Sequence, residues 1–150
     1  MLLRMTAIIF PLVLGFCVIA TAARAQKGPY AVVADGIPLA LSNLPGDAAR
    51  GREIVVNRQI GMCPLCHQVP SATDRFQGDI ATNLAGAGTR LTVPQLRLRM
   101  VDSRRVNSHS VMPAYYQSNG LTRVGASWRD RPILDAQQVE DVVAWLATLK

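Results

Sequence analysis

Cysteine and histidine are scarce in this chain of 150 residues, which has three of the first and two of the second. Exported domains that are held together by disulfides usually carry more cysteines, spread along the chain. Here Cys17 lies in an apolar N-terminal run, whereas Cys63 and Cys66 stand together in CPLCH, with His67 directly behind them. The sequence therefore does not predict a disulfide scaffold, and it concentrates any thiol or metal chemistry at residues 63–67.

Lysine is almost absent. Lys27 and Lys150 are the only two, so arginine supplies nearly all of the positive charge. Arginine favours fixed, bidentate contacts with carboxylates and oxyanions. The sequence also lacks a basic helix or a basic tail, so we do not expect nucleic-acid binding. The arginines indicate either a docking partner with an acidic face or an ordinary solvated surface, and the sequence leaves both open.

Aromatic residues make up only 5% of the chain, and no segment alternates apolar and polar residues over the length of a strand. Three segments have the pattern and the capping residues of helices: 48–60 after Asp47, 93–103 after Thr92, and 136–149 after Asp135. The intervening residues are predicted to form long loops. Such loops are uncommon in a compact domain unless another component organises them. The sequence thus predicts an all-α domain whose central apolar body is not protein.

Residues 1–25 have the three-part pattern of a secretory signal peptide. Arg4 precedes an uncharged apolar run over residues 6–20, and Ala23 and Ala25 supply small residues before a cleavage site after Ala25. The run is shorter than the ~20 residues of a membrane span. We therefore expect cleavage and export to the periplasm rather than a membrane anchor.

The predicted mature chain begins at residue 26. A lipoprotein site at Cys17 is disfavoured because the bulky Phe16 stands where a small residue is needed. The segment 1–25 contains two arginines and no acidic residue, so its removal lowers the net charge from +6 to +4. We expect an extended arm over residues 26–46, rich in glycine, proline and alanine, followed by one domain over residues 47–150.

Two thiols and an imidazole within five positions have three interpretations, of which two fit poorly. A redox CxxC pair normally follows a strand in a βαβ context, and no such context precedes Cys63. A zinc site needs four ligands, or three and a water. Cys63 and Cys66 supply two of these, and His67 is poorly aimed at the same metal. The remaining histidine, His109, stands alone.

Covalent haem accounts for every residue of the motif. Each thiol would add to one haem vinyl group, and the two intervening residues match the separation of the two vinyls. His67 would then bind the iron from the proximal side. CxxCH is the attachment signature of c-type cytochromes. The sequence therefore predicts one haem c attached through Cys63 and Cys66, and this cofactor also accounts for the sparse protein core.

The sixth iron ligand has four candidates in the sequence: Met62, Met100, Met112 and His109. Met62 belongs to the attachment segment, and Met100 lies in a predicted helix, which favours a core role. Met112 lies in an irregular segment and is followed by Pro113, which stiffens the backbone. A thioether opposite histidine favours ferrous iron and raises the reduction potential. We predict Met112 as the ligand, with His109 as the alternative.

From CPLCH onward the chain resembles the single-haem class I cytochromes c, which implies three to five helices around one covalently bound haem, with long loops. The resemblance lies in the attachment motif, in Met112–Pro113, and in Gly51 and Trp145, which would mark the crossing of the first and last helices. A closer resemblance, over about residues 45–150, is to the SoxX family. It is carried by SVMPAYY, by GLTRVGASWRDRPILDAQQVEDVVAWLATL and by the arrangement around CPLCH.

The resemblance to SoxX implies a function and a set of partners. SoxX proteins are the small haem subunits of SoxAX complexes in bacterial thiosulfate oxidation. In that family SoxA carries the site where thiosulfate is joined oxidatively to a cysteine of the SoxYZ carrier, and the SoxX haem passes electrons to a soluble cytochrome. The resemblance implies Cys63 and Cys66 as thioether anchors, and His67 and Met112 as axial ligands. A free-standing electron shuttle is the alternative function.

The implied role is electron transfer rather than catalysis by this chain. Both cysteines of the mature chain would be consumed by haem, so no catalytic residue is predicted and chemistry on sulfur would occur on a partner. Arginines near the haem edge would draw anionic substrates or an acidic partner surface. Under this hypothesis, loss of Arg123 or Arg129 weakens complex formation or makes turnover more sensitive to salt.

One departure from the cytochrome pattern lies shortly after the haem motif. Class I cytochromes usually have a Gly-Pro pair there, and its backbone carbonyl accepts the second ring N–H of the proximal histidine. This chain has Ala81 and Thr82 in the corresponding stretch. A backbone carbonyl can still serve, because the acceptor is main chain. The substitution therefore bears on the rigidity of the loop and on the fine tuning of the haem.

Overall fold

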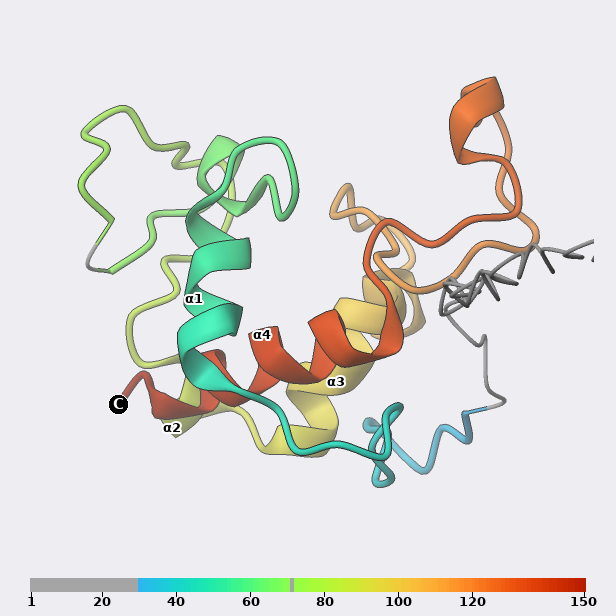
Figure 1. The fold of residues 1–150 in the computed structure, drawn as a ribbon, viewed down its shortest axis with the longest axis horizontal. Helices are drawn as coiled ribbons and strands as arrows, with labels where there is room; N and C mark the ends of the chain where they lie inside the picture. Colours follow the sequence, from blue (N-terminus) through green and yellow to red (C-terminus); the bar gives the residue numbers. More distant parts are fainter. Residues whose placement is uncertain (1–29, 71) are drawn as a thin grey trace, which may run out of the picture.

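The computed structural model describes residues 30–70 and 72–150, and the predicted signal peptide with Cys17 lies outside them. Four α-helices are present in this part of the chain: α1 (Ala48–Val56), α2 (Ala87–Arg90), α3 (Val93–Asp102) and α4 (Ala136–Thr148). Short 3₁₀ helices are η1 (Cys63–Leu65), η2 (Ser103–Arg105) and η3 (Ala126–Trp128). The only extended pairing in the described residues is an isolated bridge between Val33 and Gly36. The all-α prediction is confirmed (Figure 1).

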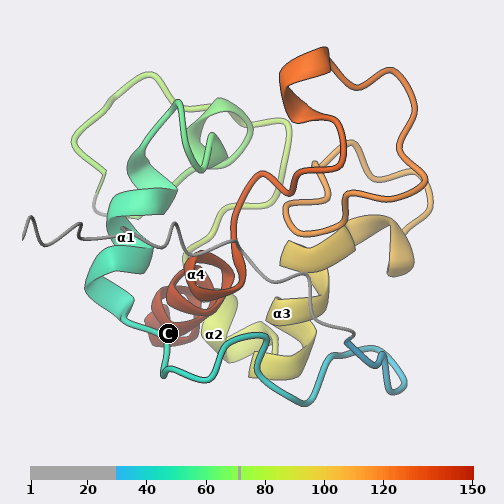
Figure 2. The same ribbon diagram turned by 45° about the vertical axis from the view of Figure 1, so that its right-hand side comes forward.

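Helix α4 is the centre of the fold. It contacts α1, α2 and α3, and Figure 2 views it nearly along its axis, with α1 on one side and α3 on the other. The predicted capping box is present, because Asp135 and Gln138 bond reciprocally through their side chains and backbone amides. Four apolar side chains of the predicted face are buried: Val139, Val142, Val143 and Leu146. Leu149, predicted within the helix, is its C-cap.

Helices α1 and α4 cross at Gly51. A Cβ added there would lie less than 3.0 Å from the carbonyl group of Asp141 and 3.0 Å from the backbone nitrogen of Val142. Only a residue without a side chain permits this approach. The crossing therefore falls one helical turn before Trp145, which is itself buried.

An ion pair reinforces the same crossing. Arg50 Nε donates to Asp141 Oδ2 at 2.8 Å, and the backbone N–H of Asp47 donates to Asp141 Oδ1 at 2.7 Å. Burial of the Asp141 carboxylate opposes ionisation, but the hydrogen bonds from Arg50, Asp47 and Gln137 together lower its pKa below the ordinary value. Asp141 is therefore charged at neutral pH and ties the start of α1 to α4.

Helix α1 is shorter than predicted, because it ends at Val56 rather than near residue 60. The side chain of Asn57 accepts hydrogen bonds from the backbone amides of Gln59 and Ile60, at 2.8 and 3.0 Å. Asparagine competes with the helix for such amides and favours a turn. Arg58, which belongs to the predicted helical segment 48–60, consequently lies outside the helix.

A buried ion pair joins α3 to α4 and also holds residues 37–41, which precede α1, against both helices. Arg97 donates to Glu140 at 2.7 and 2.9 Å, and each side chain is only 6% exposed. Arg97 also donates to the carbonyl of Ile37 at 2.6 Å, and Glu140 accepts the backbone N–H of Leu41 at 2.9 Å. Arginine here is an interior structural residue, a role that composition alone did not indicate.

The predicted loop over residues 68–91 contains α2, a single turn after Gly86, whose φ is 71°. Four residues are too few for a periodic pattern, which is why the helix was missed. The predicted helix over 93–103 is confirmed as α3, with a capping box between Thr92 and Gln95. In the described part of the chain, no helix combines the length and apolar character needed to cross a bilayer.

Candidate functional site

A cavity of about 460 Å³ lies where all four α-helices meet two loops. Most of its lining is apolar, including Val55 of α1, Leu96 of α3 and Val142 of α4. Such a volume and lining are typical of sites for cofactors. All four predicted site residues line this cavity: Cys63, Cys66, His67 and Met112. Residues as far as 49 positions apart in the sequence thus line the same cavity.

The CPLCH segment forms a single tight turn at one wall of the cavity. Met62 leads into it with a left-handed φ of 58°, and Pro64 occupies the first turn of η1. The backbone amides of Cys66 and His67 both donate to the carbonyl of Cys63, at 3.1 and 2.9 Å. This turn places the two thiols and the imidazole beside the same apolar space.

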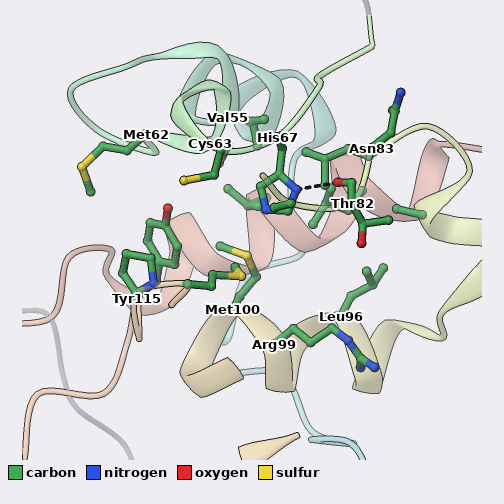
Figure 3. A pocket seen from close by; sticks show the side chains of 18 of the residues that line it. Val55, Met62, Cys63, His67, Thr82, Asn83, Leu96, Arg99, Met100 and Tyr115 are labelled. Carbon is green, nitrogen blue, oxygen red and sulfur yellow. Dashed lines mark hydrogen bonds between the residues drawn. The ribbon is translucent and has the colours of Figure 1, made fainter. Parts of the chain in front are cut away.

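The ring of His67 is held by one backbone hydrogen bond. Its Nδ1 lies 2.6 Å from the carbonyl oxygen of Thr82, as the dashed line in Figure 3 shows. A carbonyl only accepts, so Nδ1 carries the proton and Nε2 is left with a free lone pair. This is the tautomer that a metal-binding histidine needs. Thr82 therefore supplies the acceptor without the usual Gly-Pro pair.

Met112 is brought to the cavity by the way the chain returns along α3. The backbone amides of Tyr115 and Tyr116 donate to the carbonyls of Met100 and Val101, at 3.1 and 3.4 Å. These carbonyls lie at the end of α3, where intrahelical partners run out. Met112, which is three residues before Tyr115, consequently lies at the cavity wall.

Tyr115 connects this returning segment to the haem motif. It is buried and lines the cavity, and its hydroxyl donates to the carbonyl of Gly61, two residues before Cys63. Burial raises the pKa of Tyr115 above its ordinary value, so the hydroxyl stays protonated and keeps donating. Sequence reasoning missed this residue, because nothing local in SVMPAYY indicates a partner 54 positions away.

A chain of the SoxXA crystal structure from P. pantotrophus is 37% identical to this chain, with a TM-score of 0.75. The match covers 81% of this chain and 94% of that chain. This chain belongs to the SoxX family. The helical architecture is accordingly that of a class I cytochrome c, as predicted. No protein-family model and no curated protein sequence matches the chain.

Membership of the SoxX family implies haem c, and the cavity fits that group. Two thiols and an imidazole with free Nε2 face an apolar space, and a thioether sulfur is available in the returning segment. Arg90 and Arg99 also line the cavity, and arginine is a residue type that suits a ligand carrying carboxylates. Neither arginine was singled out from the sequence. Arg123 and Arg129 do not line the cavity and lie on an exposed loop around η3.

The other candidate ligands are placed differently by the SoxX fold. Met100 also lines the cavity and is only 3% exposed, and Figure 3 shows it reaching in from α3 on the side opposite His67. Met62 lines the cavity from the attachment segment. His109 is exposed and does not line the cavity. Three methionines, Met62, Met100 and Met112, thus line the space that a haem would occupy.

The redox and zinc interpretations gain no support from the geometry. Burial raises the pKa of the Cys63 thiol to about 11, whereas the attacking cysteine of a redox pair needs a thiolate near neutral pH. Among residues 30–70 and 72–150, no three side chains of histidine, cysteine, aspartate or glutamate are grouped as ligands of one metal ion. The residues around CPLCH therefore favour the cytochrome interpretation.

Proposed function

We propose that this chain is the haem-carrying electron-transfer subunit of a SoxAX-type complex that oxidatively couples thiosulfate to a cysteine of a SoxYZ-type carrier. The observation that carries the proposal is the hydrogen bond between His67 Nδ1 and Thr82 O. It fixes the imidazole tautomer needed by a proximal ligand, directly beside two thiols in one apolar cavity. The similarity to a chain of SoxXA supports a SoxA-type partner.

The roles of the site residues follow from their chemistry. Cys63 and Cys66 would form the thioether bonds to one haem c, and His67 Nε2 and Met112 Sδ would be the axial ligands. A bound haem would supply a one-electron acceptor and donor. The chain's own contribution is to orient the imidazole through Thr82, to exclude water with the apolar lining, and to retain a protonated Tyr115 at the attachment turn.

The number of free thiols indicates which reaction steps would belong to the partner proteins. Joining thiosulfate to a carrier thiol forms one S–S bond and releases one proton and two electrons. No thiol of the mature chain would remain for this step if Cys63 and Cys66 hold haem. The coupling would therefore occur at the SoxA-type subunit. The electrons would leave this chain one at a time for a soluble cytochrome in the periplasm.

The location and the domain limits belong to the same proposal. Residues 1–25 would direct export and be removed, because their pattern is that of a signal peptide. The arm over residues 26–46 would precede the cytochrome domain of residues 47–150. Haem attachment outside the cytoplasm is consistent with this order.

Purification of the mature chain from its native host tests the assignment to a complex. A SoxX-type subunit should bring a larger haem protein with it through size-exclusion chromatography. A free-standing shuttle should elute alone at the size of the single chain. Elution alone at every salt concentration would therefore favour the shuttle and contradict the proposed complex.

Two measurements test the haem assignment itself. After denaturing electrophoresis, haem stain should remain on the wild-type chain and be lost from a Cys63→Ala, Cys66→Ala double variant. A colourless wild-type polypeptide would end the cytochrome interpretation. In the ferric protein, Met112→Ala should abolish the weak red methionine–iron charge-transfer band, whereas Met100→Leu, a change of similar volume at the same cavity, should retain it. The opposite pattern would assign the ligand to Met100.

A further inference from the structure

We propose that Ser103 and Ser110 are positioning residues for Met112, acting through a closed ring of hydrogen bonds around its backbone. The inference rests on the proposed role of Met112 as an axial ligand. It adds the device that makes this methionine, rather than Met100 or His109, the side chain presented to the iron.

The ring is formed by two serine hydroxyls and the peptide groups of one residue. Ser103 Oγ donates to the carbonyl oxygen of Met112 at 3.1 Å. The Oγ atoms of Ser103 and Ser110 lie 2.9 Å apart. The backbone N–H of Met112 donates to Ser110 Oγ at 3.3 Å. Both backbone groups of Met112 are thereby held by side chains.

The direction of every bond in the ring is determined. The N–H of Met112 only donates and its carbonyl only accepts. Since the single proton of Ser103 is used on that carbonyl, the proton between the hydroxyls must come from Ser110. Each hydroxyl therefore donates once and accepts once, and all three bonds point the same way around the ring. Loss of either serine opens it.

The ring connects a long loop to a rigid element. Ser103 directly follows α3 and is only 6% exposed, so its position is set by the helix. Ser110 stands at the far end of the exposed segment 104–109. Backbone hydrogen bonds link Ser110 to Asn107 and Asn107 to Ser103 on one side of Met112, and Tyr115 to Met100 on the other, but none of them involves Met112 itself. The ring adds a further point of attachment at Ser110, two residues before Met112.

A choice between ligands makes such a device necessary. Met100 already lines the cavity from α3, and His109 belongs to the same loop as Met112. His109 is turned outward, with its own backbone N–H bonded to the side chain of Asn107 at 3.0 Å. Anchoring the backbone of Met112 on both sides selects the methionine.

Imidazole titration of the ferric protein measures how firmly Met112 is held, because added imidazole must displace it. We expect Ser103→Ala and Ser110→Ala each to bind imidazole roughly three- to tenfold more tightly than wild type, because each variant removes one of the two neutral hydrogen bonds to the Met112 backbone. The double variant should resemble either single variant, since one opening already breaks the ring. Ser110→Thr, which keeps the hydroxyl, should behave as wild type.

The matched control is Ser108→Ala, in the same loop at an exposed position. Serine variants that bind imidazole no more tightly than Ser108→Ala would overturn the inference, even if urea unfolds them more easily, because a merely structural role moves only the unfolding midpoint. Retention of the methionine–iron band in Met112→Ala would instead overturn the ligand assignment, and the inference with it. The two failures are therefore distinguishable.

Discussion

Replacement of Gly51 by alanine should destabilise the domain, although alanine is the better helix former. On an isolated helix the exchange would gain about 1 kcal/mol. In the folded chain the new methyl would lie less than 3.0 Å from the carbonyl group of Asp141, where ordinary contact begins near 3.4 Å. The obstacle is backbone, which cannot rotate away as a flexible side chain would.

The expected magnitude follows from what must move. Helices α1 and α4 would have to separate at their crossing, which disturbs the Arg50–Asp141 ion pair as well as the packing of Val55. Forcing an extra methyl into a packed interior costs about 1–3 kcal/mol. After subtraction of the gain of about 1 kcal/mol in helix propensity, we expect a net loss of up to about 2 kcal/mol in the free energy of unfolding.

Urea unfolding of the ferric protein, followed by far-ultraviolet circular dichroism, measures this change. Gly125→Ala is the matched control, because no atom lies within 4 Å of a Cβ added there and its φ of −58° suits alanine. The control should be neutral or gain up to about 1 kcal/mol. An equal gain at Gly51 would refute the close crossing of α1 and α4.

Three further predictions concern charged residues. Arg97→Ala should lower the free energy of unfolding in urea by about 3–5 kcal/mol, because it leaves Glu140 buried without this partner. Arg97→Leu combined with Glu140→Leu should recover most of this loss. A double variant as unstable as the single one would contradict the reasoning. The lowered pKa of Asp141 stabilises the fold at pH values above the unfolded carboxyl pKa of 3.8, and this stability is lost as pH falls through the lower folded pKa. Asp141→Asn should therefore make the midpoint of urea unfolding depend less on pH between pH 6 and 3. Alanine at Arg123 or Arg129 should make binding of the partner subunit weaker or more salt-sensitive in pull-down titrations, and unchanged binding would assign both to the solvated surface.

Several features of the site were predictable because their causes are local in sequence. The CPLCH turn depends on five consecutive residues, and a hydrogen bond from His67 to the carbonyl of Cys63 closes it. The start of α3 and of α4 follows from capping boxes that span four residues. Met112 was predicted from its neighbour Pro113 and from the chemistry of a thioether, and it does line the cavity.

Other features were not predicted, because they join residues far apart or result from competition between two local patterns. The end of α1 at Val56 depends on a side-chain turn at Asn57 that competes with helix pattern. The presence of Met100 beside Met112 depends on how α3 packs against α4. The clamp from Tyr115 to Gly61 and the burial of Arg97 likewise arise from partners more than 40 positions away.

The sequence by itself determined which chemistry this protein can offer: two thiols that can attach a haem, and nitrogen and sulfur atoms that can bind iron. Those properties reside in covalent structure and in contacts between near neighbours. Only the tertiary structure decided the tautomer of His67, through Thr82, and the restraint on Met112, through Ser103 and Ser110. The acceptor for His67 lies 15 positions away, and the ring at Met112 closes a loop over residues 103–112, so neither follows from a local sequence pattern.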